Sequence, residues 1–228
     1  MRIFAMIPAR IGSERLKRKN LALLNNKPLI SYAINAAKKS KVFDKIFINS
    51  DSEIFEKISI NNKINFYLRP KKLGSSATKS DEVVYDFLKK NFCDILVWVN
   101  SIAPLQSFDE IKNAVNYFKK KKFNSLITTN KFFNHAIKNK KPLNFQTNSK
   151  FEKTQNLIPI ELMVYTQMIW NSKSFIKSYE ENGNGILHGK VGYFEVSKHS
   201  GMIIKYESDL KLASILLKKT KYKLRYYK

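Results

Sequence analysis

Short apolar runs alternate with longer amphipathic stretches over the first 70 residues, and this alternation is the strongest constraint on the fold. In chain order the stretches are RIFAMI (2–7), PLISYAINAAKKS (28–40), KIFINS (45–50), SEIFEKISINN (52–62) and INFYL (64–68). The second stretch repeats its apolar residues at three- and four-residue spacing, so one side of a helix would face a sheet. Strands separated by such helices predict an α/β fold with a mixed, mostly parallel sheet flanked by helices.

The alternation continues to about residue 130 and then lapses. Further helices are expected at 81–91, at 108–121 with Ser107 as cap, and at 207–219, and further strands at 94–100, 125–129 and 163–170. Residues 131–160 are polar, aromatic and rich in lysine, with scattered prolines, which predicts a lobe or arm inserted into the domain. At 228 residues the chain fits one domain, 1–228, that carries this insert.

The apolar runs are too short to cross a membrane. The longest, such as ILVWV at 95–99, fall far below the roughly 20 residues that a span requires. The basic residues near the start of the chain mostly follow the first apolar run, whereas a secretory signal has them before it. The one cysteine, Cys93, cannot form an internal disulfide and is expected to fill the core. We therefore expect a cytoplasmic protein with no membrane partner.

The formal net charge of +24 has two interpretations. An excess of lysine and arginine is typical of proteins that bind nucleic acid or an anionic membrane. The lysines are nevertheless scattered through AAKKSK, LKKN, FKKKK and LLKKTKYK, and no helix-turn-helix, zinc finger or aromatic RNA-binding motif accompanies them. This distribution favours a solvated lysine-rich surface over a nucleic-acid-binding protein.

A basic loop, MIPARIGSERLKRKNL (6–21), follows the first expected strand. Such a loop, placed between a strand and a helix, is typical of anion-binding sites, because its backbone N–H groups and arginines can point at the ligand. The glycine spacing fits neither a P-loop nor a dinucleotide fingerprint. The polar residues available to the anion are Arg10, Ser13, Arg15, Lys19 and Asn20.

The loop and several later segments together resemble the cytidylyltransferases that activate acidic sugars, the CMP-sialic acid synthetases and their CMP-Kdo relatives. The segments are IPARIGSERLKRKNLALL, FDKIFINSDSEI, RPKKLGSSATKSDEVV, VWVNSIAPL, TQNLIPIELMVYTQMIW and ESDLKLA, in the family's order along nearly the whole chain. The resemblance implies a Rossmann-like nucleotidyltransferase domain with a protruding dimerisation arm, and hence a homodimer. The arm would correspond to the irregular stretch at about 131–160.

The same resemblance implies a reaction and a set of site residues. The anomeric hydroxyl of a 2-keto sugar acid, such as sialic acid or Kdo, would attack the α-phosphorus of CTP and release pyrophosphate. Arg10 and Lys19 would be catalytic. The residues that would bind nucleotide or sugar are Gly12, Ser13, Arg15, Asn20, Arg69, Ser80, Asn100 and Gln155. For Arg15 and Lys19 ordinary loop solvation is the alternative, and for Ser80 it is a helix cap.

The sequence departs from the family at the expected metal site. The resemblance implies Mg²⁺ held by two aspartates, six and four residues before Asp209, but those positions hold Ile203 and Lys205, and a third acid is replaced by Ile102. None of these side chains is a magnesium ligand. The chain is then either a divergent enzyme that recruits metal through the nucleotide phosphates and lysines such as Lys205, or a relative without catalysis that keeps a nucleotide or sugar acid for regulation or assembly.

Overall fold

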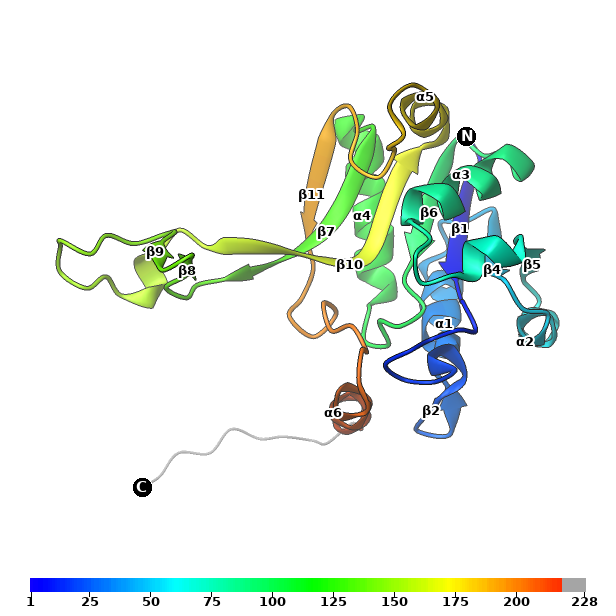
Figure 1. Ribbon diagram of the computed structural model, residues 1–228, viewed down its shortest axis with the longest axis horizontal. Helices are drawn as coiled ribbons and strands as arrows, with labels where there is room; N and C mark the ends of the chain where they lie inside the picture. Colours follow the sequence, from blue (N-terminus) through cyan, green and yellow to red (C-terminus); the bar gives the residue numbers. More distant parts are fainter. Residues whose placement is uncertain (219–228) are drawn as a thin grey trace.

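A seven-stranded sheet forms the centre of the computed structural model, which describes residues 1–218 (Figure 1). The strand order is β11-β7-β10-β6-β1-β4-β5. Their bounds are β1 Ile3–Pro8, β4 Lys45–Ser50, β5 Asn65–Leu68, β6 Ile95–Val99, β7 Ser125–Phe132, β10 Ile160–Asn171 and β11 Val191–Glu195. All neighbouring pairs are parallel except those of β10, which is antiparallel to both β6 and β7. The sheet is therefore mixed and mostly parallel, as the sequence predicts.

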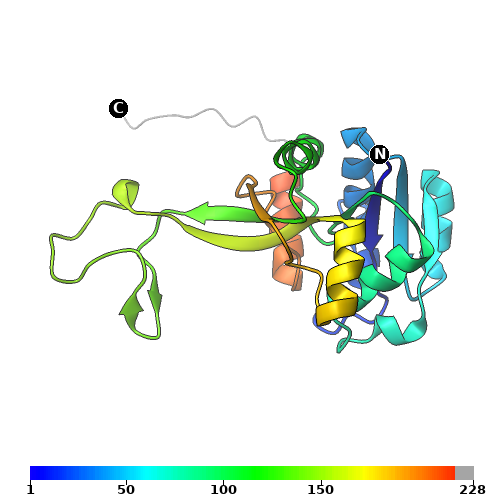
Figure 2. The same cartoon turned by 90° about the horizontal axis from the view of Figure 1, so that it is seen from above.

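Helices cover both faces of the sheet, with α1 and α4 on one side and α3 and α5 on the other (Figure 2). The helices are α1 Ile30–Ser40, α2 Ile54–Asn62, α3 Ser80–Lys90, α4 Phe108–Lys121, α5 Ser172–Asn182 and α6 Glu207–Leu217. Successive side chains of β1 point to opposite faces of the sheet, so Ala5 and Ile7 pack under α1, whereas Phe4 and Met6 pack under α3. This double cover explains why the central strands are apolar runs.

Most expected elements are present, with shifted ends. The first helix starts at Ile30 because Lys27–Pro28 (β3) pairs with Leu23–Leu24 (β2) in a hairpin that the sequence did not indicate. Ser107 caps α4 as expected, since its Oγ accepts from the Asp109 N–H at 3.2 Å. The terminal helix ends at Leu217, and residue 219, its expected last residue, lies outside the described residues, as do residues 220–228 of the expected single domain.

Cys93 lies in the core, as expected. Its side chain is buried, and its Sγ lies 3.4 Å from the hydroxyl oxygen of Ser172. Burial raises the pKa of the thiol to about 11, so it is uncharged at neutral pH.

The expected insert projects from the body as an arm (Figures 1 and 2). The strands β7 and β10 continue as a ribbon beyond the rest of the sheet, with Phe132 opposite Ile160. Between them the chain forms a small hairpin of β8 (Ile137–Lys138) and β9 (Lys141–Pro142), and a 3₁₀ turn, η3 (Thr154–Asn156). The protruding shape agrees with the expectation, and the role of the arm in dimerisation stays a prediction.

No helix within residues 1–218 has both the length and the apolar character to cross a membrane.

Candidate active site

A cleft of about 520 Å³ opens at the carboxyl ends of β1 and β6. The loop after β1, the residue after β5, the start of α3 and the loop after β6 contribute its walls. Ligands of open α/β sheets bind at this edge. Eight of the residues predicted from the sequence line the cleft: Arg10, Ser13, Arg15, Lys19, Asn20, Arg69, Ser80 and Asn100.

Two predicted residues do not line the cleft. Gly12 belongs to the same loop. A Cβ added there would meet no atom within 4 Å, and the backbone of Gly12 is not in the left-handed region, so neither packing nor conformation requires a glycine at this position. Gln155 lies exposed in η3, on the arm. Within one chain, the structure does not bring Gln155 to the other predicted residues.

The loop after β1 is folded back by its own polar side chains. It ends in a 3₁₀ turn, η1 (Lys19–Leu21), which Arg18 enters in the left-handed conformation. Lys19 and Asn20 are buried. The Lys19 Nζ donates to the carbonyl oxygen of Ile204 at 3.0 Å, and the Asn20 Nδ2 donates to the carbonyl oxygen of Arg10 at 3.3 Å. Lys19 is thus held on a packed turn at the edge of the cleft.

The electrostatic environment of Lys19 favours an anion. Burial lowers the pKa of its ammonium group, and the positive charges of Arg15 and Arg10 lower it further. Lys205 acts in the same direction, and Asp209 opposes it. A bound polyanion relieves this repulsion, so the charge arrangement is that of an anion-binding site.

Arg69 forms the opposite wall and is held by an acid behind it. Its Nη2 lies 3.6 Å from the Asp51 carboxylate, and its Nη1 donates to the Asn49 Oδ1 at 3.4 Å. Burial lowers the pKa of the guanidinium, and the Asp51 charge opposes that shift. Asp51 also accepts from the Ile11 N–H at 3.1 Å, so one carboxylate fixes Arg69 and the cationic loop together.

Three polar atoms of the cleft residues are buried without a hydrogen-bond partner among residues 1–218. They are the Asn20 Oδ1, the Arg69 Nε and the Trp98 Nε1. Buried polar atoms are normally paired, and an unpaired set at a cleft indicates groups left for a ligand. Trp98 was missed by sequence reasoning because its run, ILVWV, reads only as a buried strand.

Ser80 and Asn100 have different environments. Ser80 is the first residue of α3 and the N-cap is Lys79, so the interpretation of Ser80 as a helix cap is wrong. The Asn100 side chain holds its own loop, because its Nδ2 donates to the Tyr165 carbonyl at 2.9 Å and its Oδ1 accepts from the Ile102 N–H at 3.2 Å. Asn100 thereby joins the floor of the cleft to the strand that leads into the arm.

The residues at the expected metal position do not fit Mg²⁺. The Ile204 N–H donates to the Ile102 carbonyl at 2.9 Å, so both segments that would carry acids lie side by side, and they pack as an apolar cluster with Leu24. The Asp209 carboxylate is already used, since it accepts from the Lys205 and Tyr206 N–H groups. Glu14 is the one acid lining the cleft within residues 1–218, and that range holds no cluster of three potential metal ligands. Mg²⁺ in nucleotide sites is normally held by one or two carboxylates together with substrate phosphates and water, and the expected positions supply no carboxylate.

Comparison with solved structures defines the class of fold. A CMP:2-keto-3-deoxy-manno-octonic acid synthetase complexed with CTP aligns with a TM-score of 0.76 over 95% of this chain and 98% of that one, at 13% identity. A 4-diphosphocytidyl-2C-methyl-D-erythritol synthase from Anaerococcus prevotii aligns with a TM-score of 0.69 over 96% and 99%, also at 13% identity. The chain therefore has the Rossmann-like fold of these two proteins.

The chain belongs to the cytidylyltransferase family, whose profile matches residues 4–227. An N-acylneuraminate cytidylyltransferase from Streptococcus agalactiae is 32% identical over 140 residues, 59% of this chain and 33% of that protein. A CMP-N,N'-diacetyllegionaminic acid synthase from Legionella pneumophila is 33% identical over 52% of this chain and 54% of its own length. The chain thus spans about a third of the first relative and about half of the second. A flagellin modification protein B from Campylobacter coli is 27% identical over 95% of both chains. The family and the fold expected from the sequence are confirmed.

Proposed function

We propose that the chain transfers CMP from CTP to a 2-keto sugar acid of the sialic acid, Kdo or related nonulosonate type, for the synthesis of surface glycans. The sugar's anomeric hydroxyl loses its proton to solvent and its oxygen attacks the α-phosphorus. The bond between the α-phosphorus and the oxygen that bridges to the β-phosphorus breaks, and pyrophosphate leaves with that oxygen. The carrying observation is the cleft itself, in which Arg10, Arg15 and Lys19 converge beside three unpaired buried polar atoms. Family membership and the names of the similar proteins support the substrate class.

The proposed roles follow from charge and position. Arg10, Arg15 and Lys19 neutralise the triphosphate, because phosphoryl transfer requires positioning and charge stabilisation more than a nucleophilic side chain. Asn20 and Arg69 offer one acceptor and one donor to the cytidine. The expectation that Mg²⁺ takes part rests on the family resemblance alone, because the residues at the expected position do not fit the ion. The expectation that the protein is cytoplasmic stays a prediction.

A second candidate function is nucleotide or sugar-acid binding without turnover, in a regulatory or assembly role. The observation that favours it is that the positions where acids are expected hold Ile102, Ile203 and Lys205, and that Ile102 packs with Ile204 in an apolar cluster. A site that has lost those carboxylates keeps its phosphate-binding loop, so it can bind without catalysing.

The experiment combines titration calorimetry with CTP and ATP and a pyrophosphate-release assay with a panel of 2-keto sugar acids. Preferential CTP binding with release at about 1–10 per second supports the transferase. CTP binding without release supports the second function, as does a gain of release in the Ile203→Asp, Lys205→Asp double variant. Equal or absent binding of CTP and ATP contradicts both. Lys120→Ala, an exposed change on α4, is the control.

We also propose that the chain acts as a homodimer through the insert at about 131–160. Large apolar side chains on this arm are exposed, among them Ile137, Phe151 and Ile158. A projecting segment with such side chains is more stable when it packs on a partner copy.

A further inference from the structure

We infer that the cleft binds the nucleoside triphosphate as its metal-free anion, with the Lys205 ammonium supplying charge that a divalent cation supplies elsewhere. The inference rests on the proposed triphosphate binding and adds which ionic form the site selects. It follows from how residues 203–205 are held at the cleft and from the surplus of cations there.

Backbone bonds fix Ile204 between two walls of the cleft. Its N–H donates to the carbonyl of Ile102, in the loop after β6, at 2.9 Å. Its carbonyl accepts from the Lys19 Nζ, in the loop after β1, at 3.0 Å. Lys205 is the next residue, so its side chain starts beside the Lys19 ammonium, at the edge of the phosphate-binding loop.

The backbone of Lys205 is also fixed on its other side. Its N–H and that of Tyr206 donate to one Asp209 oxygen, at 2.7 and 2.8 Å, which caps α6. Asp209 is thereby occupied, and Lys205 forms no ion pair with any residue in 1–218. The ammonium group is exposed and remains available to a ligand.

The charge of the site matches a free triphosphate better than a metal-bound one. Four cations, Arg10, Arg15, Lys19 and Arg69, line the cleft against the single acid Glu14 within the described residues. Asp51 pairs with Arg69 from behind, so the cations of the loop after β1 supply the surplus, and Lys205 adds a further charge at the edge of the cleft. Arg15, Arg10 and Lys205 repel the Lys19 ammonium. A bound anion reduces this repulsion more the more negative charge it carries. Mg²⁺ cancels about half the charge of a triphosphate and would itself be repelled by this cluster.

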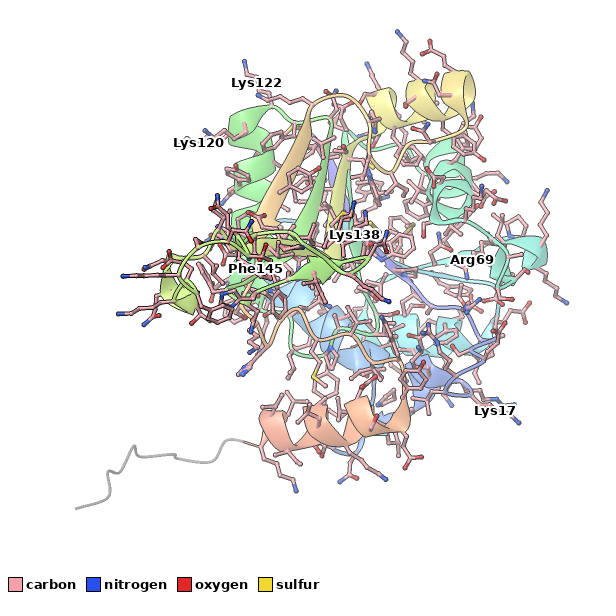
Figure 3. The ribbon with its side chains drawn as sticks, turned by 60° about the vertical axis from the view of Figure 1, so that its left-hand side comes forward. Lys17, Arg69, Lys120, Lys122, Lys138 and Phe145 are labelled. Atoms are coloured by element: carbon pink, nitrogen blue, oxygen red, sulfur yellow. The ribbon has the colours of Figure 1, made fainter. Side chains whose placement is uncertain are left out.

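The test is titration calorimetry with CTP and with inorganic triphosphate, each in EDTA and in excess Mg²⁺, together with ATP in EDTA to compare the two bases. For the unaltered chain we expect metal-free affinity that equals or exceeds the affinity in Mg²⁺. Lys205→Ala should weaken metal-free binding of both ligands by about tenfold, the loss of one charge-assisted phosphate contact. Lys205→Glu should shift the preference toward the Mg²⁺-bound ligand. Lys120→Ala, at a distance on α4 (Figure 3), should match the unaltered chain, and circular dichroism checks the fold of each variant.

The outcomes separate this inference from the proposed function. CTP binding that requires Mg²⁺, or metal-free binding that Lys205→Ala leaves unchanged, overturns the inference and leaves the proposed function standing. Metal-free triphosphate binding that depends on Lys205, without preference for CTP over ATP, supports the inference and contradicts the proposed function. Absence of binding by both ligands under both conditions overturns both.

Discussion

Asp51 connects two walls of the cleft, because its one carboxylate contacts both the buried Arg69 guanidinium and the Ile11 N–H. The side chains of Arg69 and Asp51 are 4% and 10% exposed, so water screens their pair poorly. We predict that Asp51→Asn destabilises the protein by about 3 kcal/mol, since it leaves the arginine charge buried without its ion-pair partner. Urea unfolding at pH 7 measures the change.

The matched control is Glu181→Gln, which removes the acid of the exposed pair with Lys177. Water screens that pair, so its loss should be a small fraction of the loss at Asp51. Equal losses in the two variants would show that burial does not set the strength of the Arg69 pair.

His188 should make the folded state sensitive to acid. Its Nδ1 lies 2.6 Å from the Gly185 carbonyl and therefore donates, and its Nε2 lies 2.8 Å from the Ser174 hydroxyl oxygen. Burial disfavours the charged imidazolium and lowers the pKa of His188 below the usual 6.5, although the hydrogen bond to Gly185 acts in the opposite direction. Because the folded-state pKa is depressed, the unfolded chain takes up the proton first, so stability is full above about pH 6.5 and falls as the pH drops through the folded-state pKa.

Thermal unfolding at pH 7, 6 and 5 tests this dependence. The unaltered chain and His199→Gln, at an exposed histidine, should lose stability together on acidification. His188→Gln should start lower at pH 7, because it loses the two buried hydrogen bonds, and should then lose less between pH 7 and 5. A slope in His188→Gln as steep as in the unaltered chain would assign the acid sensitivity to other groups.

The residues of the cleft were predictable in part. The cations of the loop after β1 were readable because a basic loop between a strand and a helix has a known use, and Arg69 came from the family resemblance. Trp98 was not readable, since the loss of a partner for its Nε1 depends on tertiary packing. Asp51 was not readable either, because its partner Arg69 comes from the next strand of the sheet.

At the scale of single elements, β10 contains the clearest backbone strain. The register with β7 shifts between Met163 and Met168, and Tyr165 in this bulge has φ 56°. An aromatic residue in the left-handed region costs about 1–2 kcal/mol. We predict that Tyr165→Gly raises stability by about 0.5–1 kcal/mol, the relieved strain less the added entropy of glycine in the unfolded chain. Denaturant unfolding measures it.

Tyr193→Gly on the neighbouring β11 is the control for this change. Tyr193 is 53% exposed against 46% for Tyr165, but it lies in a strand without the left-handed backbone. Its replacement should therefore lower stability. If both glycine variants lower stability alike, the φ of Tyr165 stores no usable strain.

Elements with a long apolar pattern were predicted, and those without one were missed. The helix α5 (SKSFIKSYEEN) is mostly polar, and Phe175 is the one large apolar residue that it buries fully. The strand β11 (VGYFE) is short and contains Gly192, where an added Cβ would come within 2.6 Å of the Phe123 ring. The structure requires glycine there because Phe123 packs closely against it, whereas in a sequence a glycine argues against a strand.

For the whole molecule, the net charge of +24 allows a prediction about nucleic acid. Lys17 lies on the opposite side of the body from Lys120 and Lys122, so these lysines do not share one face (Figure 3). We predict weak binding of duplex and single-stranded DNA at low salt that disappears at about 0.15 M, because few phosphates can be contacted at once. Fluorescence anisotropy against salt concentration measures it, and submicromolar binding at that salt would instead favour a nucleic-acid-binding protein.

The arm determines how the whole molecule should assemble. It projects far from the body, and its side chains Ile137, Phe151 and Ile158 are 66%, 77% and 78% exposed (Figure 2). Phe151 stacks on His135 with ring centroids 4.0 Å apart, so the tip is ordered enough to present a defined apolar surface. Such a surface would be a liability in a monomer, and a second copy can cover it with the same surface.

We predict that light scattering at micromolar concentration gives twice the mass of one chain. The Phe151→Ser, Ile158→Ser variant should give the mass of one chain and unfold at a lower temperature when the two are compared at equal concentration, because association stabilises the folded state by mass action. The Ile54→Ser, Ile60→Ser variant removes two exposed apolar side chains from α2, on the body, and should remain dimeric. A monomer mass for the unaltered chain would contradict the dimer, and loss of the dimer in the α2 variant instead of the arm variant would move the interface to the body.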